Sequence, residues 1–114
     1  MTCKRGDVIL VRFPNSDLKT AKKRPALIVQ SDRVATGLSQ RIVAMITSNL
    51  ERTGPTRITV PRQSLHGKAM GILTDSVIVA DNLATVLDRE IDRKLGEFPN
   101  MSEADQALRI ILGI

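Results

Sequence analysis

Four basic side chains gather in one short segment of this sequence, where Lys19, Lys22, Lys23 and Arg24 precede Pro25. Lysines attract phosphate groups as point charges, whereas the planar guanidinium of arginine can hold two phosphate oxygens at once. A residue before proline is restricted to an extended backbone, which limits the directions in which Arg24 can project. The segment therefore indicates phosphate chemistry, although the same charges are also typical of a solvated loop.

Small polar and acidic side chains follow two apolar runs further along the chain. Thr47, Ser48 and Asn49 end one run, where their side chains can bind a ligand or cap the turn that follows. Asp81 ends the other run. A buried carboxylate without a partner is costly, so this group either reaches water at a turn or pairs with a cation. The functional hypothesis for Asp81 is a carboxylate positioned beside Arg24.

Residue types for other common mechanisms are scarce. One histidine, His66, and one cysteine, Cys3, cannot build a structural zinc site, and a lone cysteine cannot form an internal disulfide. We interpret His66 as a loop histidine and Cys3 as an inert thiol in a terminal segment. The sequence contains no glycine-rich phosphate loop and no carboxylate cluster suited to a metal. If the protein is an enzyme, we expect it to work without a metal, a cofactor or a histidine pair.

The elements that must position these groups are predicted to be short strands followed by helices. Asp81 and Asn82 are expected to form a turn. Proline fits the start of a strand, which places Pro25 first in the second strand. Apolar and β-branched runs predict strands or apolar segments at 7–13, 25–30, 40–47, 56–60, 71–74, 76–80 and 84–87.

Helices are expected at the end of the chain. Asp88 can cap a short helix that ends near Leu95, and Ser102 can cap a final one. The apolar face of that final helix is expected to hold Met101, Ala104, Leu108, Ile111 and Leu112. The whole pattern predicts a single domain over residues 1–114, mostly β with a C-terminal helix, in which a small antiparallel sheet curls into a barrel.

Composition narrows the classes of partner. The chain has 114 residues and a formal net charge of +5, and 12 of its 17 lysines and arginines lie in residues 1–62. A basic half favours a polyanionic partner such as RNA, DNA or an acidic protein. With only two aromatic residues, Phe13 and Phe98, base stacking on aromatic platforms is not expected. No apolar run resembles a membrane span or a signal peptide, so we expect a cytoplasmic protein without a membrane partner.

Four stretches together resemble the MazF/PemK/Kid family of toxins from type II toxin–antitoxin systems. They are the Gly-Asp start at 6–11, the Arg-Pro strand at 24–29, the Thr-Ser strand end at 47–48, and the segment 76–86 that contains Asp81. Their order and spacing match over nearly the whole chain. The resemblance implies an SH3-like barrel of the CcdB/Kid/MazF type, a homodimer, and an antitoxin that covers the active groove.

The resemblance also implies metal-independent endoribonuclease activity on single-stranded RNA. In the family, the arginine of the Arg-Pro pair and the threonine that ends the next strand are functional, and they correspond to Arg24 and Thr47. An acidic residue implicated in some members corresponds to Asp81. We expect attack by the ribose 2′-OH on its neighbouring phosphate, with Arg24 stabilising charge, Thr47 holding the phosphate, and Asp81 accepting the proton or orienting Arg24.

Several residues are expected to assist RNA binding without a catalytic role. They are Lys22, Lys23, Arg12, Ser48 and Asn49. The first loop departs from relatives, because it lacks the histidine of some members and the glycine and glutamate or glutamine common in others. Two alternatives share the same barrel: a CcdB-like toxin that binds DNA gyrase and cuts nothing, and a catalytically inactive RNA-binding relative.

Overall fold

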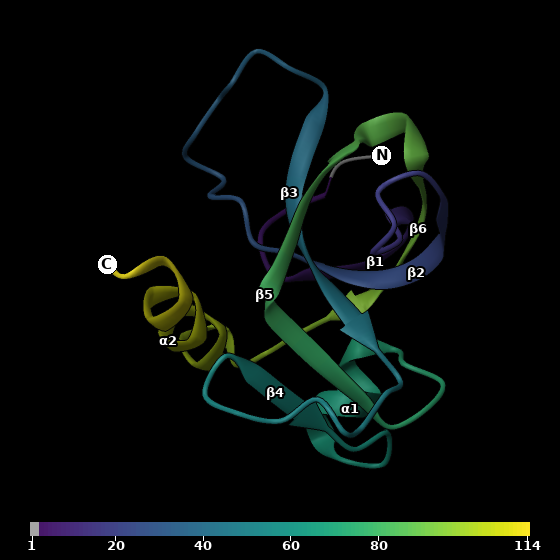
Figure 1. The fold of residues 1–114 in the computed structure, drawn as a ribbon, viewed down its shortest axis with the longest axis vertical. Helices are drawn as coiled ribbons and strands as arrows, with labels where there is room; N and C mark the ends of the chain where they lie inside the picture. Colours follow the sequence, from purple (N-terminus) through teal and green to yellow (C-terminus); the bar gives the residue numbers. More distant parts are fainter. Residues whose placement is uncertain (1–2) are drawn as a thin grey trace.

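A computed structural model describes residues 3–114 of the chain, which build six strands, two α-helices and one 3-10 turn (Figure 1). Their order along the chain is β1 (Asp7–Pro14), β2 (Ala21–Ile28), β3 (Gln40–Thr47), β4 (Arg57–Val60), α1 (Leu65–Met70), β5 (Ser76–Leu87), η1 (Asp88–Glu90), β6 (Ile91–Glu97) and α2 (Met101–Leu112). The predicted fold class, mostly β with a C-terminal helix, is confirmed.

The six strands form one antiparallel sheet in the order β4-β5-β3-β2-β1-β6. Because successive side chains of a strand point to opposite faces, the sheet buries two apolar clusters. One is centred on Phe13, with Ala26 and Met45 beside it. The other contains Leu27 and the phenyl ring of Phe98. The curled sheet therefore has a filled interior on one face and a second core beneath its helices on the other.

Strand β2 begins four positions earlier than the sequence predicted, at Ala21 rather than Pro25. The hairpin explains this, because β1 and β2 stay paired from Val8↔Leu27 to Pro14↔Ala21. On its other side β2 pairs with β3 only from Ala26 onward. Pro25 therefore lies where one side of the strand is unpaired, which a residue without an N–H tolerates. Arg24 projects from within a strand rather than from a loop.

The predicted turn at residues 81–82 is wrong. Strand β5 runs without a break from Ser76 to Leu87. Its register against β3 shifts between Met45↔Val79 and Ala44↔Leu83, so that residues 80–82 form a bulge. Bulges of this kind bend a strand and re-aim its side chains without ending it. The polar dipeptide thus marks an irregularity inside one long strand.

The helix predicted after Asp88 is also wrong, because only η1 is helical there and the chain continues as β6 along the edge of β1. Pairing with β1 overrides the local helical preference. Conversely, α1 was not predicted; Ser64 caps it by accepting a hydrogen bond from the N–H of Gly67 at 3.0 Å. His66 belongs to α1 rather than to a loop, with its ring edge-on to Phe98 at a centroid distance of 5.6 Å.

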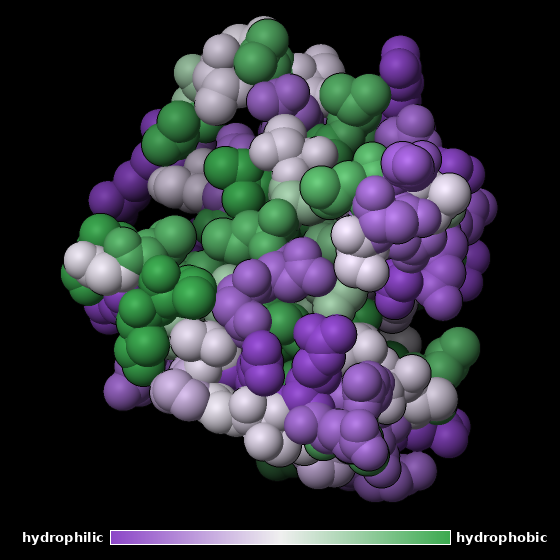
Figure 2. All heavy atoms as spheres, in the orientation of Figure 1, coloured by the Kyte–Doolittle hydropathy of each residue, from purple (hydrophilic) through white to green (hydrophobic). Residues whose placement is uncertain are grey.

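The final helix α2 begins after Asn100, two positions before the predicted cap Ser102. Its first half packs on the sheet through Ala104 and Ala107. The apolar side chains of its last turns remain exposed: Ile110, Ile111, Leu112 and, beyond it, Ile114. Figure 2 shows hydrophobic side chains gathered at this end of α2 and across the middle of the same face, over β5 and β3. In the described part of the chain, no helix has the length and apolar character to cross a membrane.

Candidate active site

A small polar pocket with a volume of about 220 Å³ lies between the first half of β2 and the end of β3. It is bounded by the β1–β2 hairpin, by the end of β3 and by the start of β5. Lysines, an arginine and hydroxyl groups line it: Lys22, Lys23, Arg24, Pro25, Ile46, Thr47, Ser48, Thr74 and Ser76. Five of the residues predicted from the sequence therefore lie together, and Thr74 and Ser76 join them from a segment that the sequence did not single out.

The sheet register explains why Arg24 and Thr47 meet. Ala26 of β2 pairs with Met45 of β3, and the strands are antiparallel. Two positions further along each strand, in opposite chain directions, are Arg24 and Thr47. Alternate residues of a strand share a face, so both side chains project on the face that carries Ala26 and Met45. The pairing of these two residues is thus a consequence of register.

The guanidinium of Arg24 has hydrogen-bond partners for only some of its donors. Its Nη2 donates a hydrogen bond to Oδ1 of Asn15 at 2.8 Å. Its Nε is buried, and among residues 3–114 it has no hydrogen-bond partner. Burying a donor without a partner is unfavourable, so Arg24 keeps hydrogen-bonding capacity that residues 3–114 do not use. The bond to Asn15 orients the guanidinium without satisfying all of its donors.

Asn15 was not predicted from the sequence, and a chain of hydrogen bonds fixes it within the hairpin loop. Its Nδ2 donates to Oγ1 of Thr20 at 2.8 Å, and that hydroxyl donates to Asp17 at 2.9 Å. The carboxylate of Asp17 also accepts from the backbone N–H groups of Lys19 and Thr20, and these bonds lower the pKa of Asp17. A folded, hydrogen-bonded loop therefore orients Arg24. No spacing rule in the sequence signals this role for Asn15.

The sequence left open whether Thr47 caps the turn or faces a ligand site, and in the structure it caps the turn and also lines the pocket. Its Oγ1 accepts a hydrogen bond from the N–H of Asn49 at 3.2 Å, which caps the turn, and it also lines the pocket. Its hydroxyl hydrogen remains available to a ligand, because accepting uses only a lone pair. Ser48 lines the pocket as well. Asn49 does not: it is exposed, and its Oδ1 accepts from the N–H of Glu51 at 3.1 Å.

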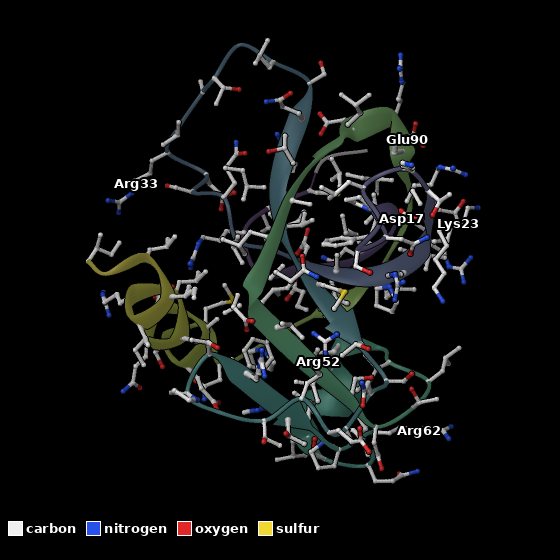
Figure 3. The ribbon with its side chains drawn as sticks, in the orientation of Figure 1. Asp17, Lys23, Arg33, Arg52, Arg62 and Glu90 are labelled. Carbon is white, nitrogen blue, oxygen red and sulfur yellow. The ribbon has the colours of Figure 1, made fainter. Side chains whose placement is uncertain are left out.

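The predicted RNA-binding cations divide between the two faces of the hairpin. Lys22 alternates with Lys23, so it shares the Arg24 face, whereas Lys23 pairs with Arg12 on the opposite face. Figure 3 shows Lys23 and the loop residue Asp17 at the outer edge of this hairpin. Arg12 does not line the pocket and lies 3.7 Å from Glu90.

The hypothesised contact between Asp81 and Arg24 is absent from the described structure. Both carboxylate oxygens of Asp81 are bound to Arg57, at 3.1 Å from Nε and 2.9 Å from Nη2, and Thr56 adds a hydroxyl at 3.0 Å. The hydrogen bonds from Arg57 are the main cause that lowers the pKa of Asp81 to about 2. Asp81 also lies outside the pocket. Its pairing with a cation, rather than with water at a turn, is the alternative that the structure shows.

Metal ligands do not gather in this region. Over the described range 3–114, no three histidine, cysteine, aspartate or glutamate side chains come close enough together to hold a metal ion. The groups that the pocket presents are a guanidinium, ammonium groups and hydroxyls, all of which can donate to an anion. A pocket lined by such donors is chemically suited to an anion such as a phosphate group.

Comparison with known proteins defines the family. Residues 4–112 match the family model described as PemK-like, MazF-like toxin of type II toxin-antitoxin system, so the chain belongs to that family. It is 31% identical over 105 residues to Endoribonuclease MazF2 of Mycobacterium bovis and to Endoribonuclease MazF6 of Mycobacterium tuberculosis. Each alignment covers 89% of this chain and 88% of the relative.

Solved structures show the same fold. An endoribonuclease in complex with its cognate antitoxin, from a mycobacterial species, superposes with a TM-score of 0.75 at 25% identity and covers 99% of this chain and 97% of its own. MazF from Deinococcus radiodurans also gives a TM-score of 0.75, at 22% identity, and covers 100% and 99%. These matches confirm the predicted family, fold and enzyme class, an endoribonuclease of the MazF type.

Proposed function

We propose that this toxin cleaves single-stranded RNA at the pocket formed by Arg24 and Thr47. The observation that carries the proposal is the pocket in which Arg24, oriented by the bond from Nη2 to Asn15 and with its Nε unpaired among the described residues, lies beside Thr47 and other hydroxyls. A phosphate in this pocket accepts hydrogen bonds from the guanidinium. The endoribonuclease names of the curated relatives support RNA as the source of that phosphate.

The reaction uses the nucleophile that RNA carries. The 2′-OH of one ribose attacks the adjacent phosphorus, the bond from phosphorus to O5′ breaks, and the products are a 2′,3′-cyclic phosphate and a 5′-OH. The proton of the 2′-OH leaves to a base, and O5′ takes up a proton. Arg24 binds the non-bridging oxygens as charge accumulates on them, and the Thr47 hydroxyl donates to the same phosphate. A guanidinium keeps its proton in proteins, so Arg24 acts on charge rather than as the base.

The surrounding cations attract the RNA backbone. Lys22 and Lys23 are exposed at the mouth of the pocket and contribute through long-range, salt-dependent attraction. Ser48, Thr74 and Ser76 supply the remaining hydroxyls. Asp81 is bound to Arg57 outside the pocket, and we infer that its role is to stabilise the packing of β4 against β5. The mechanism that we propose needs no metal. We also infer that the protein acts in the cytoplasm, where RNA is available as its substrate.

Two protein partners complete the proposal: an antitoxin and a second copy of the chain. The antitoxin rests on the family and on relatives whose structures were solved with one. The homodimer is supported by the exposed apolar side chains at the end of α2 and by Val34, Leu38 and Ile42 from the segment before and within β3. Exposed apolar surface on this scale is typical of an interface. Sedimentation of Ile111→Asp, compared with the unmodified chain, tests the dimer: we expect a monomer.

The deciding experiment is incubation of the purified protein with a long single-stranded RNA in EDTA. We expect cleavage with cyclic phosphate ends, lost in Arg24→Ala and retained in the matched control Arg62→Ala, whose exposed arginine lies outside this pocket and away from the exposed end of α2. Intact RNA combined with inhibition of gyrase supercoiling would favour the CcdB-like alternative. Intact RNA that is nevertheless bound would favour the inactive relative.

A further inference from the structure

A second cavity, with a volume of about 450 Å³, adjoins the Arg24 pocket. Its walls are largely aliphatic, and the guanidinium of Arg93 stands among them: Leu10, Pro25, Ile72, Leu73, Leu95 and Arg93. The two cavities share Pro25, Thr74 and Ser76 as lining residues, so they lie side by side. A flexible strand bound at Arg24 can place its next group in this second cavity.

The register explains the composition of this cavity. Leu10 of β1 pairs with Pro25 on one side and with Arg93 on the other. Paired residues of neighbouring strands share a face, so these three side chains form one row across β2, β1 and β6. The next row along the hairpin pairs Arg12 with Lys23. An apolar hollow therefore lies directly beside a row of cations.

The cations of this face are only weakly neutralised. Arg12 lies 3.7 Å from Glu90, and Lys23 lies 3.6 Å from Asp92. Both cations have more than half of their side-chain surface exposed. Exposed ion pairs at such distances contribute little to stability. A phosphate backbone that follows this row can replace the carboxylates at small cost.

Aromatic residues cannot supply the stacking surface in this protein. Phe13 and Phe98 are both buried in the two core clusters, with 0% and 2% of their surface exposed, and the sequence contains no tyrosine or tryptophan. Single-stranded nucleic acid is nevertheless bound through the faces of its bases as well as its phosphates. Aliphatic walls together with a planar guanidinium offer a surface on which a base can lie.

We propose that the cavity lined by Leu73 and Arg93 binds the nucleobase next to the scissile phosphate and sets the base preference of cleavage. This rests on the proposed function, because the phosphate at Arg24 fixes which base reaches the cavity. Leu73 covers the open side of the base, and Arg93 stacks on it or donates to its acceptor edge. The hydroxyl of Thr74, at the junction of the two cavities, faces both the phosphate and the base.

Two variants test the proposal, each with a matched control. Leu73→Ser and Arg93→Ala change side chains that are 79% and 63% exposed, so the fold should tolerate both. Leu65→Ser removes another exposed leucine, 85% exposed, on α1, and Arg62→Ala removes another exposed arginine; neither residue lines this cavity. All four variants and the unmodified protein digest an RNA pool of randomised sequence in EDTA, and sequencing of the ends reports the bases beside each cut.

We expect the base enrichment at one position beside the cut to fall at least about threefold in Leu73→Ser and Arg93→Ala. Cleavage of the favoured sites should slow roughly tenfold, the effect of losing one base contact, while the other positions and both controls stay unchanged. Unchanged preference in both cavity variants would overturn the proposal. A lower rate with unchanged preference would overturn it as well, since the cavity would then only support the phosphate pocket.

Failure of the proposed function has a different signature. If the unmodified protein cuts no RNA, nuclease activity is excluded, and binding of 2′-O-methylated oligonucleotides, which lack the nucleophile, then tests the cavity by itself. Base-dependent binding that weakens in Leu73→Ser and Arg93→Ala supports the nucleobase site. Equal binding by these variants and the unmodified protein overturns it.

Discussion

Arg24 and Arg57 lie on one face of the same sheet, yet they differ in the hydrogen-bond partners of their guanidinium groups. Arg57 pairs with Val79, Val79 with Met45, and Met45 with Ala26, two residues from Arg24. Arg57 donates through both Nε and Nη2 to the carboxylate of Asp81, so its charge is neutralised and both of these donors are already used. Arg24 donates through Nη2 to a neutral amide and keeps a buried Nε without a partner in the described chain.

The difference separates an arginine that holds the fold from one that can bind a substrate. A bidentate ion pair is satisfied in itself and gains nothing from a phosphate. An amide orients a guanidinium without cancelling its charge, so the full charge remains available when negative charge accumulates in a transition state. Substitutions that exchange or remove these partners test whether the distinction is real.

The largest effect is expected for the two arginines themselves. Arg24→Ala should lower RNA cleavage by roughly a hundred- to a thousandfold, the usual loss when one donor to a developing oxyanion is removed, while thermal unfolding changes little. Arg57→Ala should do the reverse: cleavage persists, and the protein unfolds at a lower temperature because a half-buried carboxylate loses its partner. Gel assays of RNA cleavage and thermal melts of both variants measure these two effects. An Arg57→Ala variant that unfolds normally but no longer cleaves RNA would contradict the distinction between the two arginines.

A smaller but more specific effect is expected when Asn15 is made acidic. Asn15→Asp gives Arg24 the kind of partner that Arg57 already has, and the new carboxylate competes with the phosphate. We expect cleavage to fall by about ten- to a hundredfold, the range for one hydrogen bond to a charged group. The loss should ease only at pH values below the ordinary pKa of aspartate, because Arg24 lowers the pKa of the new carboxyl as Arg57 lowers that of Asp81.

Asn15→Ala is the matched control for that experiment. It removes the bond to Arg24 without adding charge, so its loss should be smaller and independent of pH in the acidic range. If both substitutions of Asn15 leave the cleavage rate unchanged, the hairpin does not orient Arg24.

Thr47 gives the next effect in size. Thr47→Val keeps the shape but removes the hydroxyl, and we expect cleavage to slow by roughly tenfold, as one hydrogen bond to the phosphate is lost. Thr56→Val is the control, because Thr56 serves Asp81 instead. Single-turnover rates on one defined RNA measure both variants, and equal losses in the two would place the effect in the fold rather than in the site.

The strands predicted from the sequence agree with the structure where a local apolar run is enough to define the strand. β1 and β3 follow from apolar runs, and Arg24 meets Thr47 because β2 and β3 pair with Ala26 opposite Met45. The long-range choices could not be read from local pattern. β6 is a strand because β1 offers it an edge, and Asp81 turns to Arg57 because the β4–β5 register brings together residues 24 positions apart.

The hairpin was the most informative error. In a strand that begins at residue 21, simple alternation puts Lys23 on the face opposite Arg24, and the hairpin register adds Arg12 to that face. The role of Asn15 cannot be read from alternation, because it depends on how Asp17 and Thr20 close the loop.

The smallest effect on cleavage is expected at Asp81. The pKa of this carboxyl is lowered from 3.8 to about 2 by Arg57, so its contribution to stability is present above about pH 4 and is lost as the pH falls through 2. Asp81→Asn should therefore cost about 1–2 kcal/mol of unfolding free energy at neutral pH, since partial exposure reduces the full linkage value. The difference from the unmodified protein should shrink between pH 4 and pH 2, as followed by denaturant melts. RNA cleavage at neutral pH should stay within about twofold, as expected for a group outside the pocket. A large loss of cleavage with unchanged stability would instead make Asp81 a participant in the reaction, and would remove the contrast between the two arginines.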